Sequence, residues 1–420
     1  MIKIRPFRGL RPIPEKAGEI ASPPYDVLDK YEARALAQNN PNSFLHVIKP
    51  EIDLPDSVDP YSGVVYQKGK QNLERLINDG LMIQDAMPCF YIYKLKMGNH
   101  EQVGLAVAAS VDDYLAKRIK EHESTRPDKE QDRFNHIDCL NANTGPVFLM
   151  YKEKSKITAL INEGMQAQAD YDFIGVHGVQ NTLWVIKAPK LIKQLQDEFA
   201  QVEALYVADG HHRAAAAARI CELRKKQNPG HTGDEEYNFF LAVIFPDAQM
   251  NILEYNRAIA DINGYSDEAF IARIKKHFDV RLFIDENGTN GKAYKPGQKA
   301  HFGMYFRDKW YALSAKSDTY NGSDPVEVLD VSILQKNLLS PVLGINDPRM
   351  DQRICFIGGI RGLAELERIV NNGNCDVAFS MYPTSIEQLI AVADAGLMMP
   401  PKSTWFEPKL QSGLLVHFLD

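Results

Sequence analysis

The run Asp209 to Arg213, with the sequence DGHHR, places an acid, two histidines and an arginine in a single turn. An apolar segment precedes the run and an alanine-rich segment follows it, which predicts a strand that ends at Asp-Gly and a helix that begins there. The first backbone N–H groups of such a helix can bind an anion. Arg213 is unfavourable in the first turn of a helix unless an anion joins it, and its guanidinium suits phosphate.

The side chains of this turn suggest phosphate chemistry. Asp209 could hold a magnesium ion or orient a hydroxyl group. His211 and His212 could donate hydrogen bonds to phosphoryl oxygens. The alternative is a tight turn in which Asp209 caps the helix and the histidines are merely polar. We favour the functional interpretation because five polar or conformationally special residues, Gly210 among them, share one turn.

A second stretch, Ser22 to Val27 with the sequence SPPYDV, combines two prolines with a tyrosine and an acid. The prolines restrict the backbone and would hold Tyr25 and Asp26 rigidly. The stretch is therefore a possible part of a site. A structural loop in which Asp26 caps the next helix explains it equally well.

A third stretch, Glu121 to Thr125, precedes Lys129 and Arg133. Because these two cations are four residues apart, a helix would place them on one face, where an anionic ligand would relieve their repulsion. The alternative is a solvated charged helix. The site candidates from this stretch are His122, Glu123, Thr125, Lys129 and Arg133.

A fourth stretch, Met398 to Phe406, contains Lys402, Ser403 and Thr404 after two prolines, and Lys409 follows. Such a loop could cradle an anion, although it is not a Walker A motif. The alternative is a C-terminal segment that packs on the core.

The composition is that of an ordinary globular protein. The 420 residues include 45% apolar residues, and 48 basic against 55 acidic side chains give a net charge of −7. The length suggests two or three domains, and the acidic balance argues against nucleic acid as the main partner. The apolar runs are too short to span a membrane, and the N-terminus lacks the apolar stretch of a signal peptide. We therefore expect a cytoplasmic protein with reduced cysteines.

The elements that must position these residues alternate between strands and helices, with hairpins that a purely doubly wound sheet would lack. Ser266 is predicted to cap a helix. This pattern predicts a mixed α/β (α+β) fold. The predicted strands include 43–49, 89–96, 101–111, 204–208, 238–245, 301–306 and 310–314, the predicted helices include 31–39, 129–141, 213–226 and 326–339, and 288–297 is predicted to be a loop.

These motifs together resemble the bacterial family known as domain of unknown function 1015. Four separated segments carry the resemblance in the same order, and they are Ser22 to Val27, His122 to Thr125 with Lys129 and Arg133, Asp209 to Arg213, and Met399 to Thr404 with Phe406 and Lys409. The DGHHR turn is also similar to the signature turn of the ParB/sulfiredoxin-like superfamily. The resemblance implies a ParB/sulfiredoxin-like core with additional mixed-sheet and helical elaborations.

That superfamily includes CTP-hydrolysing DNA-partition proteins, sulfiredoxins and free-serine kinases. Sulfiredoxin chemistry requires a cysteine after the turn glycine, where this chain has His211. A partition protein should carry a helix-turn-helix module and a basic surface, and neither is evident here. The resemblance therefore favours a kinase similar to those that use pyrophosphate as donor.

On this basis we expect transfer of a phosphoryl group from pyrophosphate or a nucleotide to a small hydroxyl compound, with L-serine giving O-phosphoserine as the first choice. The alternative is a non-catalytic regulatory protein that binds a nucleotide or phosphate. Expected partners are small molecules, without nucleic acid or membrane, and the expected cofactor is Mg²⁺ with Asp209 as a possible ligand and no organic cofactor. The expected catalytic residues are Asp209, His211, His212, Asp26 and Glu123, and the expected binding residues are Arg213, Gly210, Tyr25, His122, Thr125, Lys129, Arg133, Lys402, Ser403, Thr404 and Lys409.

The same motifs divide the chain into three predicted parts. Residues 1–145 carry the SPPYD and HE-x-T segments. Residues 146–262 form the core part with the DGHHR turn. Residues 263–420 form the C-terminal part with the MPPKST segment, which would close the site.

Overall fold

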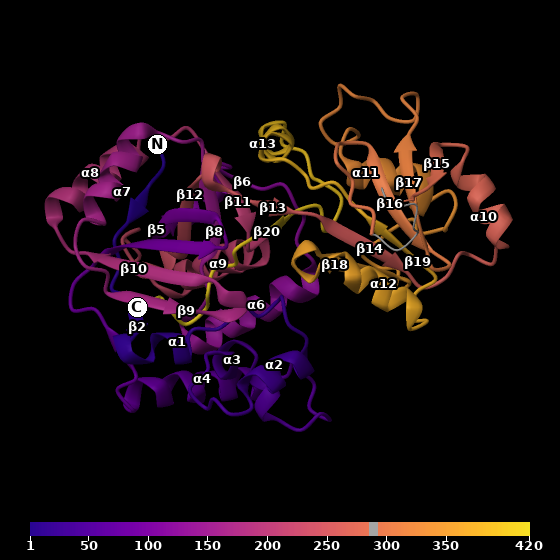
Figure 1. The fold of residues 1–420 in the computed structure, drawn as a ribbon. Coiled ribbons are helices and arrows are strands. Elements are labelled where there is room, and N and C mark those ends of the chain that lie inside the picture. The colour runs from indigo at the N-terminus through magenta and orange to yellow at the C-terminus, as the bar shows by residue number, and fades with distance from the viewer. Residues whose placement is uncertain (285–292) are drawn as a thin grey trace. The chain divides into compact units, whose positions relative to one another are not determined.

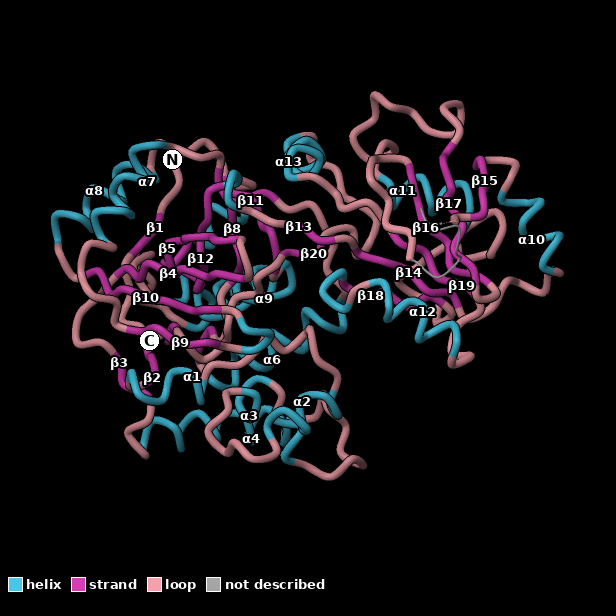
Figure 2. The backbone as a smooth tube through the Cα atoms, viewed as in Figure 1, coloured by secondary structure: helices cyan, strands magenta, loops and turns pink. Residues whose placement is uncertain are grey.

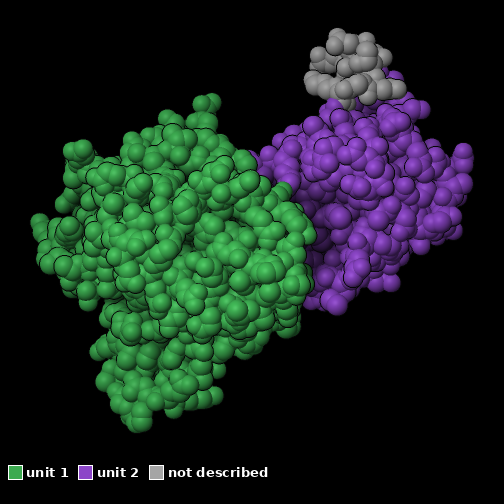
Figure 3. All heavy atoms as spheres, turned by 90° about the horizontal axis from the view of Figure 1, so that it is seen from below, with its two compact units in different colours: residues 1–121, 125–250, 408–420 green, residues 122–124, 251–407 purple. Residues whose placement is uncertain are grey.

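The fold of the chain is known from a computed structural model that describes residues 1–284 and 293–420. The chain forms two compact units, coloured separately in Figure 3. Unit 1 comprises residues 1–121, 125–250 and 408–420, and unit 2 comprises residues 122–124 and 251–407. These units cut the chain differently from the three predicted parts, because residues 1–145 and most of 146–262 share unit 1.

Unit 1 is built on a mixed sheet with the strand order β6-β11-β8-β12-β5-β4-β10-β9, and β1 pairs with β5 (Figure 1). The pairs β11–β6 and β12–β8 are parallel, and the other pairs are antiparallel. Every residue of β12 is buried, as its continuous apolar sequence predicts. The strands are β1 (Ile4–Arg5), β4 (Phe90–Met97), β5 (His100–Ser110), β6 (Ile119–Lys120), β8 (Val147–Tyr151), β9 (Tyr171–Ile174), β10 (Gln180–Ile186), β11 (Leu205–Asp209) and β12 (Phe239–Pro246).

Helices cover this sheet in two groups. Figure 2 shows α7 (Ser155–Gly164) and α8 (Pro189–Phe199) side by side, apart from the layer formed by α2 (Lys30–Ala37), α3 (Leu45–Ile48) and α4 (Gly63–Asn78). The helices that carry the site are α6 (Pro127–Leu140) and α9 (His211–Gln227), which pack against each other. Among the described residues, no helix combines the length and the apolar sequence that crossing a membrane requires.

Unit 2 contains an antiparallel sheet with the strand order β15-β17-β16-β19-β14-β18. Ser266 caps α10 by accepting a hydrogen bond from the N–H of Ala269, as predicted. A short pair, β13 (Ile252–Leu253) with β20 (Trp405–Phe406), lies outside this sheet. The main elements are β14 (Tyr255–Ile259), α10 (Asp267–Ile274), β15 (Phe278–Leu282), β16 (His301–Phe306), β17 (Lys309–Ala315), α11 (Asp330–Leu334), β18 (Ile354–Gly358), α12 (Leu363–Asn371), β19 (Val377–Ser380) and α13 (Ile386–Asp394).

The mixed α/β fold class is confirmed, and both predicted hairpins form. The strand predicted over 43–49 is wrong, because Leu45–Ile48 form the short helix α3. Periodicity cannot distinguish a short apolar strand from a buried helical turn, and here contact with α4 selects the helix. The loop predicted over 288–297 lies outside the described residues as far as 292, and 293–297 have no regular structure. The ParB/sulfiredoxin-like assignment stays a prediction.

Candidate functional site

The DGHHR run forms the turn between β11 and α9, as the sequence predicts. Gly210 lies at the N-cap of α9 with φ +95°, a conformation that residues with a side chain rarely adopt. A Cβ atom at this position would also lie 3.1 Å from Nε of Arg213, because the guanidinium folds back over the glycine. Gly210 thus shapes the turn and leaves room for Arg213.

Replacing Gly210 with alanine is therefore expected to lower the free energy of unfolding by about 1–2 kcal/mol, the cost of a left-handed backbone for a residue with a Cβ. Urea denaturation measures this change. The matched control is Gly63→Ala, since Gly63 begins α4 and has no atom within 4 Å of an added Cβ. Equal effects of the two substitutions would contradict the role of the Gly210 conformation.

Asp209 is held between two cations of unit 1. Its Oδ2 accepts a hydrogen bond from Nζ of Lys409 at 2.6 Å, and its Oδ1 lies 3.9 Å from Nη2 of Arg213. Burial alone would raise the pKa of Asp209, but the charges of Lys409 and Arg213 outweigh it and hold this pKa well below its usual range. The carboxylate therefore stays ionised and positions both cations. Lys409, predicted as a phosphate ligand, is in direct contact with Asp209.

The first turns of α6 and α9 lie side by side. His212 Nε2 accepts a hydrogen bond from the N–H of Arg126, the residue before α6, at 3.0 Å. Farther along, Arg219 pairs with Glu130 and Arg224 pairs with Asp138, so the two helices run parallel. Parallel helices bring their positive ends together, and this arrangement favours an anion at the N-termini.

Arg133, on α6, is fully enclosed beside the SPPYD segment. Its guanidinium stacks on the ring of Tyr25, 3.9 Å from the ring centroid, and donates to Oδ2 of Asp132 at 2.7 Å. Tyr66 donates to the other oxygen of Asp132 at 3.0 Å. Burial raises the pKa of Tyr25, so its hydroxyl keeps its proton. The structure thus brings together residues from the second and third sequence motifs.

Arg133 and Arg213 line the same pocket of unit 1, whose volume is about 30 Å³. Tyr25 and the C-terminal segment also contribute to it, and Ser22 and Ser412 pair through their backbones at its edge. The pocket therefore joins the DGHHR turn to two other predicted motifs. Its lining residues are Tyr25, Ile48, Arg133, His136, Ile137, Asn143, Thr144, Gly145, Val147, Arg213, Phe240, Leu241 and Ser412.

His136 in this lining makes the stability of unit 1 depend on pH. Its Nε2 donates to the carbonyl of Val47 at 3.0 Å, and burial, helped by the charge of Arg133, lowers its pKa to about 4. The unfolded chain, with a histidine pKa of about 6.5, binds more protons between these two values, so stability falls as the pH drops from about 6.5 to 4.

Between pH 7.5 and pH 5 the expected loss from His136 is about 2 kcal/mol, measured by urea denaturation at both values. The free energy of unfolding of a His136→Gln variant should fall by correspondingly less over the same pH interval. The control is His100→Gln, in the hairpin between β4 and β5, and its free energy of unfolding should fall as much as that of the wild type. Identical pH dependence of all three proteins would contradict the assignment.

The remaining predicted residues of unit 1 lie around this centre with partners of their own. Thr125 donates to Glu130 at 2.8 Å, and Lys129 donates to the hydroxyl of Tyr61 at 2.7 Å. Asp26 is exposed, and its charge acts on the neighbouring hydroxyl of Tyr25. Asp26 does not cap the next helix, because Asp29 caps α2 with a full capping box.

A second group of predicted residues belongs to unit 2. His122 Nε2 lies 3.2 Å from Oγ1 of Thr404, and the N–H of Met399 donates to the carbonyl of His122 at 2.8 Å. The third and fourth motifs therefore meet within this unit. Ser403 donates to the carbonyl of Pro400 at 2.6 Å. Glu123 and Lys402 are part of the same unit.

Sequence reasoning missed several residues that support these groups. Asp132, His136, Thr144 and Ser412 line or brace the pocket of unit 1, and only Asp132 had a signal, its position next to Arg133. In unit 2, buried Arg257 on β14 donates to the carbonyl of Lys402 at 2.9 Å, and burial lowers its pKa to about 10. An isolated arginine in an apolar strand was the signal for Arg257.

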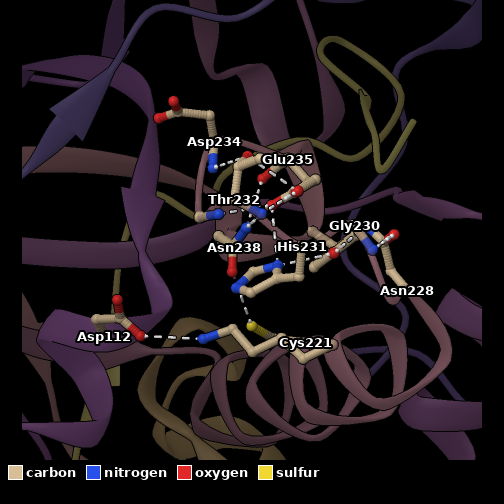
Figure 4. Close-up of polar contacts among 12 residues, drawn as sticks. Asp112, Cys221, Asn228, Gly230, His231, Thr232, Asp234, Glu235 and Asn238 are labelled. Atoms are coloured by element: carbon tan, nitrogen blue, oxygen red, sulfur yellow. Dashed lines mark hydrogen bonds and ion pairs between the residues drawn. The ribbon is translucent and has the colours of Figure 1, made fainter.

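Cys221 is a structural thiol. It lies two turns into α9, beneath the Asn228 to Asn238 loop, and its Sγ donates to Oδ1 of Asn238 at 3.5 Å (Figure 4). Burial raises its pKa, which keeps the sulfur protonated and unreactive. Cys221 therefore offers no substitute for the cysteine that sulfiredoxin chemistry requires.

The described residues form no ready-made metal site. Among them, no three histidine, cysteine, aspartate or glutamate side chains gather closely enough to hold a metal ion. Asp209, the predicted Mg²⁺ ligand, is already paired with Lys409. Because Mg²⁺ is commonly held by one or two carboxylates together with substrate phosphates, the expected ion would depend on ligands from the phosphate donor.

The fold and the candidate site thus define a mixed α/β protein with a charged turn between a strand and the N-terminus of a helix. The chain belongs to the family described as protein of unknown function DUF1015, which matches residues 4–332. This confirms the family that the motifs predicted, although the Met399 to Lys409 segment lies outside the match. No curated protein matches the chain.

Similar solved structures include a free serine kinase in complex with AMP, at 15% identity, TM-score 0.33 and coverage of 74% of this chain and 89% of that chain. A conserved hypothetical protein from Pyrococcus furiosus matches at 15% identity, TM-score 0.34 and coverage of 75% and 95%. SbnI with a C-terminal truncation from Staphylococcus aureus matches at 12% identity, TM-score 0.36 and coverage of 74% and 87%. Similarity at this level carries no argument about the reaction of this chain.

Proposed function

We propose that the chain is a phosphotransferase that moves a phosphoryl group from pyrophosphate, or from a nucleotide, to the hydroxyl of a small metabolite. The acceptor that the family resemblance favours is free L-serine, with O-phosphoserine as the product. The observation that carries the proposal is the β11–α9 turn, where Asp209 holds Lys409 and Arg213 at the N-terminus of α9. Phosphoryl transfer depends mainly on positioning and on electrostatic stabilisation of the phosphoryl oxygens, which such a turn can supply.

In the proposed step the acceptor oxygen forms a bond to the terminal phosphorus of the donor. The bond from that phosphorus to the bridging oxygen breaks, and its electron pair leaves with the departing phosphate. Arg213 would neutralise charge on the phosphoryl oxygens, His211 and His212 would donate hydrogen bonds to them, and Asp209 would keep the cations in place. Bound Mg²⁺ would neutralise further charge on the donor.

The hydroxyl proton must pass to a base, and we assign this role to Asp26. Asp26 is exposed next to Tyr25, so its carboxylate is open to an acceptor hydroxyl. Glu123, the other base that the sequence predicts, belongs to unit 2.

A phosphorus NMR time course on the purified chain tests the proposal. The samples contain Mg²⁺ and L-serine with pyrophosphate, ATP or ADP as donor, and a matched series omits Mg²⁺. Growth of a phosphoserine signal with one donor identifies the reaction and the donor. Absence of transfer with every donor would reject a serine kinase.

A non-catalytic phosphate or nucleotide binder is the second candidate. The observation that favours it is that both oxygens of Asp209 face cations, which makes this acid a structural clamp. A binder should saturate with ligand and release no product, whereas an enzyme should consume the donor only when the acceptor is present.

A further inference from the structure

The pocket of unit 1 is lined by several polar side chains, and one of their atoms is buried without a hydrogen-bond partner among the described residues. Nε of Arg213 is buried and has no hydrogen-bond partner among the described residues. The hydroxyls of Tyr25, Thr144 and Ser412 and the guanidinium of Arg133 line the same pocket. Because buried polar groups are nearly always hydrogen-bonded, the unpaired Nε of Arg213 points to a ligand in this pocket.

Two guanidinium groups, those of Arg133 and Arg213, line the pocket. Carboxylates outside the lining balance them: Asp132 pairs with Arg133, Asp209 lies near Arg213, and Glu51 also acts on Arg133. Burial keeps His136 neutral near pH 7. Arg133 is only 8% exposed and Lys409 has a side chain that is 14% exposed. Two guanidinium groups directed at one small pocket suit an anionic ligand, because arginine binds phosphate and carboxylate through several N–H groups at once.

The size and the arrangement of the donors distinguish between possible anions. A pocket of about 30 Å³ is small, so it suits a compact group better than a nucleobase. The two guanidiniums come from different helices, and the three hydroxyls come from three other segments, so the donors approach from many directions. A tetrahedral oxyanion, with acceptors on all sides, matches this arrangement better than a planar carboxylate.

We infer that this pocket is a binding site for one phosphoryl group, with Arg133, Arg213, Tyr25, Thr144 and Ser412 as its ligands. The inference rests on the proposed function and deepens it, since it locates one phosphate of the reaction within unit 1. The group is either free orthophosphate or the end of a larger phosphate compound, and both present the same oxygens to the pocket.

Isothermal titration of the full chain with orthophosphate, pyrophosphate and L-serine in separate experiments tests the inference without any turnover. The key variants are Thr144→Val and Ser412→Ala, which remove one hydroxyl each and preserve the packing of the fold. Removal of a hydroxyl that binds a charged oxygen should weaken the affinity for phosphate about tenfold. The matched controls are Thr158→Val on α7 and Arg219→Met on α9, neither of which lines the pocket.

Tenfold weaker binding of orthophosphate or of pyrophosphate in both hydroxyl variants, with the controls unchanged, supports the inference. If the variants bind orthophosphate more weakly, the free ion is a ligand of the pocket. If they bind only pyrophosphate more weakly, the pocket holds the end of a larger donor. Phosphate affinities that equal the wild type in both variants would overturn the inference, as would weakened binding of L-serine alone. A chain that binds phosphate here and transfers none would refute the proposed function and leave the site intact.

Discussion

Asp209→Asn is expected to reduce the rate of phosphoryl transfer at least a hundredfold while the chain stays folded. The substitution preserves the shape of the side chain and removes the charge that holds Lys409 at 2.6 Å and Arg213 at 3.9 Å. Without this charge the two cations repel each other and lose their fixed positions beside the N-terminus of α9. Loss of one positioned electrostatic donor typically costs about 10²–10³ in rate, and Asp209 positions two such cations. The initial rate of phosphoserine formation, followed by phosphorus NMR, measures the effect.

The matched control for this variant is Asp112→Asn, because Asp112 also pairs with a lysine, Lys225 on α9, but lies outside the pocket. We expect its rate to stay within about twofold of the wild type, since exposed ion pairs contribute little. Circular dichroism and thermal melting confirm that both variants are folded. A wild-type rate for Asp209→Asn would remove Asp209 from the mechanism.

The fold class could be predicted because its strongest signals are local. The continuous apolar run of β12 and the turn residues of the two hairpins each specify an element without reference to the rest of the chain. The strand predicted over 43–49 failed for the opposite reason, because tertiary contact with α4 determines that short segment. The order of strands in the sheet, and the return of residues 408–420 to unit 1, depend on contacts that no local pattern encodes.

The sequence indicates which residue types belong to the candidate site, but it does not indicate which of these residues the fold brings together. The sequence picks out Asp209, Arg213 and Arg133 by their positions in short motifs, and the structure places all three around one pocket or its edge. Thr144 and Ser412 are ordinary hydroxyl residues in the sequence, and they reach the pocket only because the segment before β8 and the C-terminal segment pass it. Lys409, expected to bind phosphate, contacts Asp209 because a buried carboxylate requires a cation.

Arg213→Lys is expected to reduce kcat/KM for the phosphate donor about a hundredfold, although it retains the positive charge. The guanidinium divides its N–H groups among three directions, with Nη1 donating to the carbonyl of Pro146, Nη2 facing Asp209 and Nε buried at the pocket. A lysine ammonium is a single point of charge on a flexible chain and cannot serve these directions at once. It also cannot reproduce the flat contact of the guanidinium over Gly210.

The matched control is Arg219→Lys, because Arg219 lies on the same helix and pairs with Glu130 outside the pocket. We expect this variant to keep the wild-type kcat/KM, so that a loss in Arg213→Lys alone separates the geometry of the guanidinium from its charge. If Arg213→Lys retains full activity, a positive charge alone is sufficient at this position, and the proposal that the direction of Nε matters is wrong. If both variants lose activity equally, the effect arises from the stability of α9. A selective loss would show that the turn works through the fixed positions of its N–H groups, which is how a rigid helix N-terminus and one arginine can together stabilise a transferring phosphoryl group.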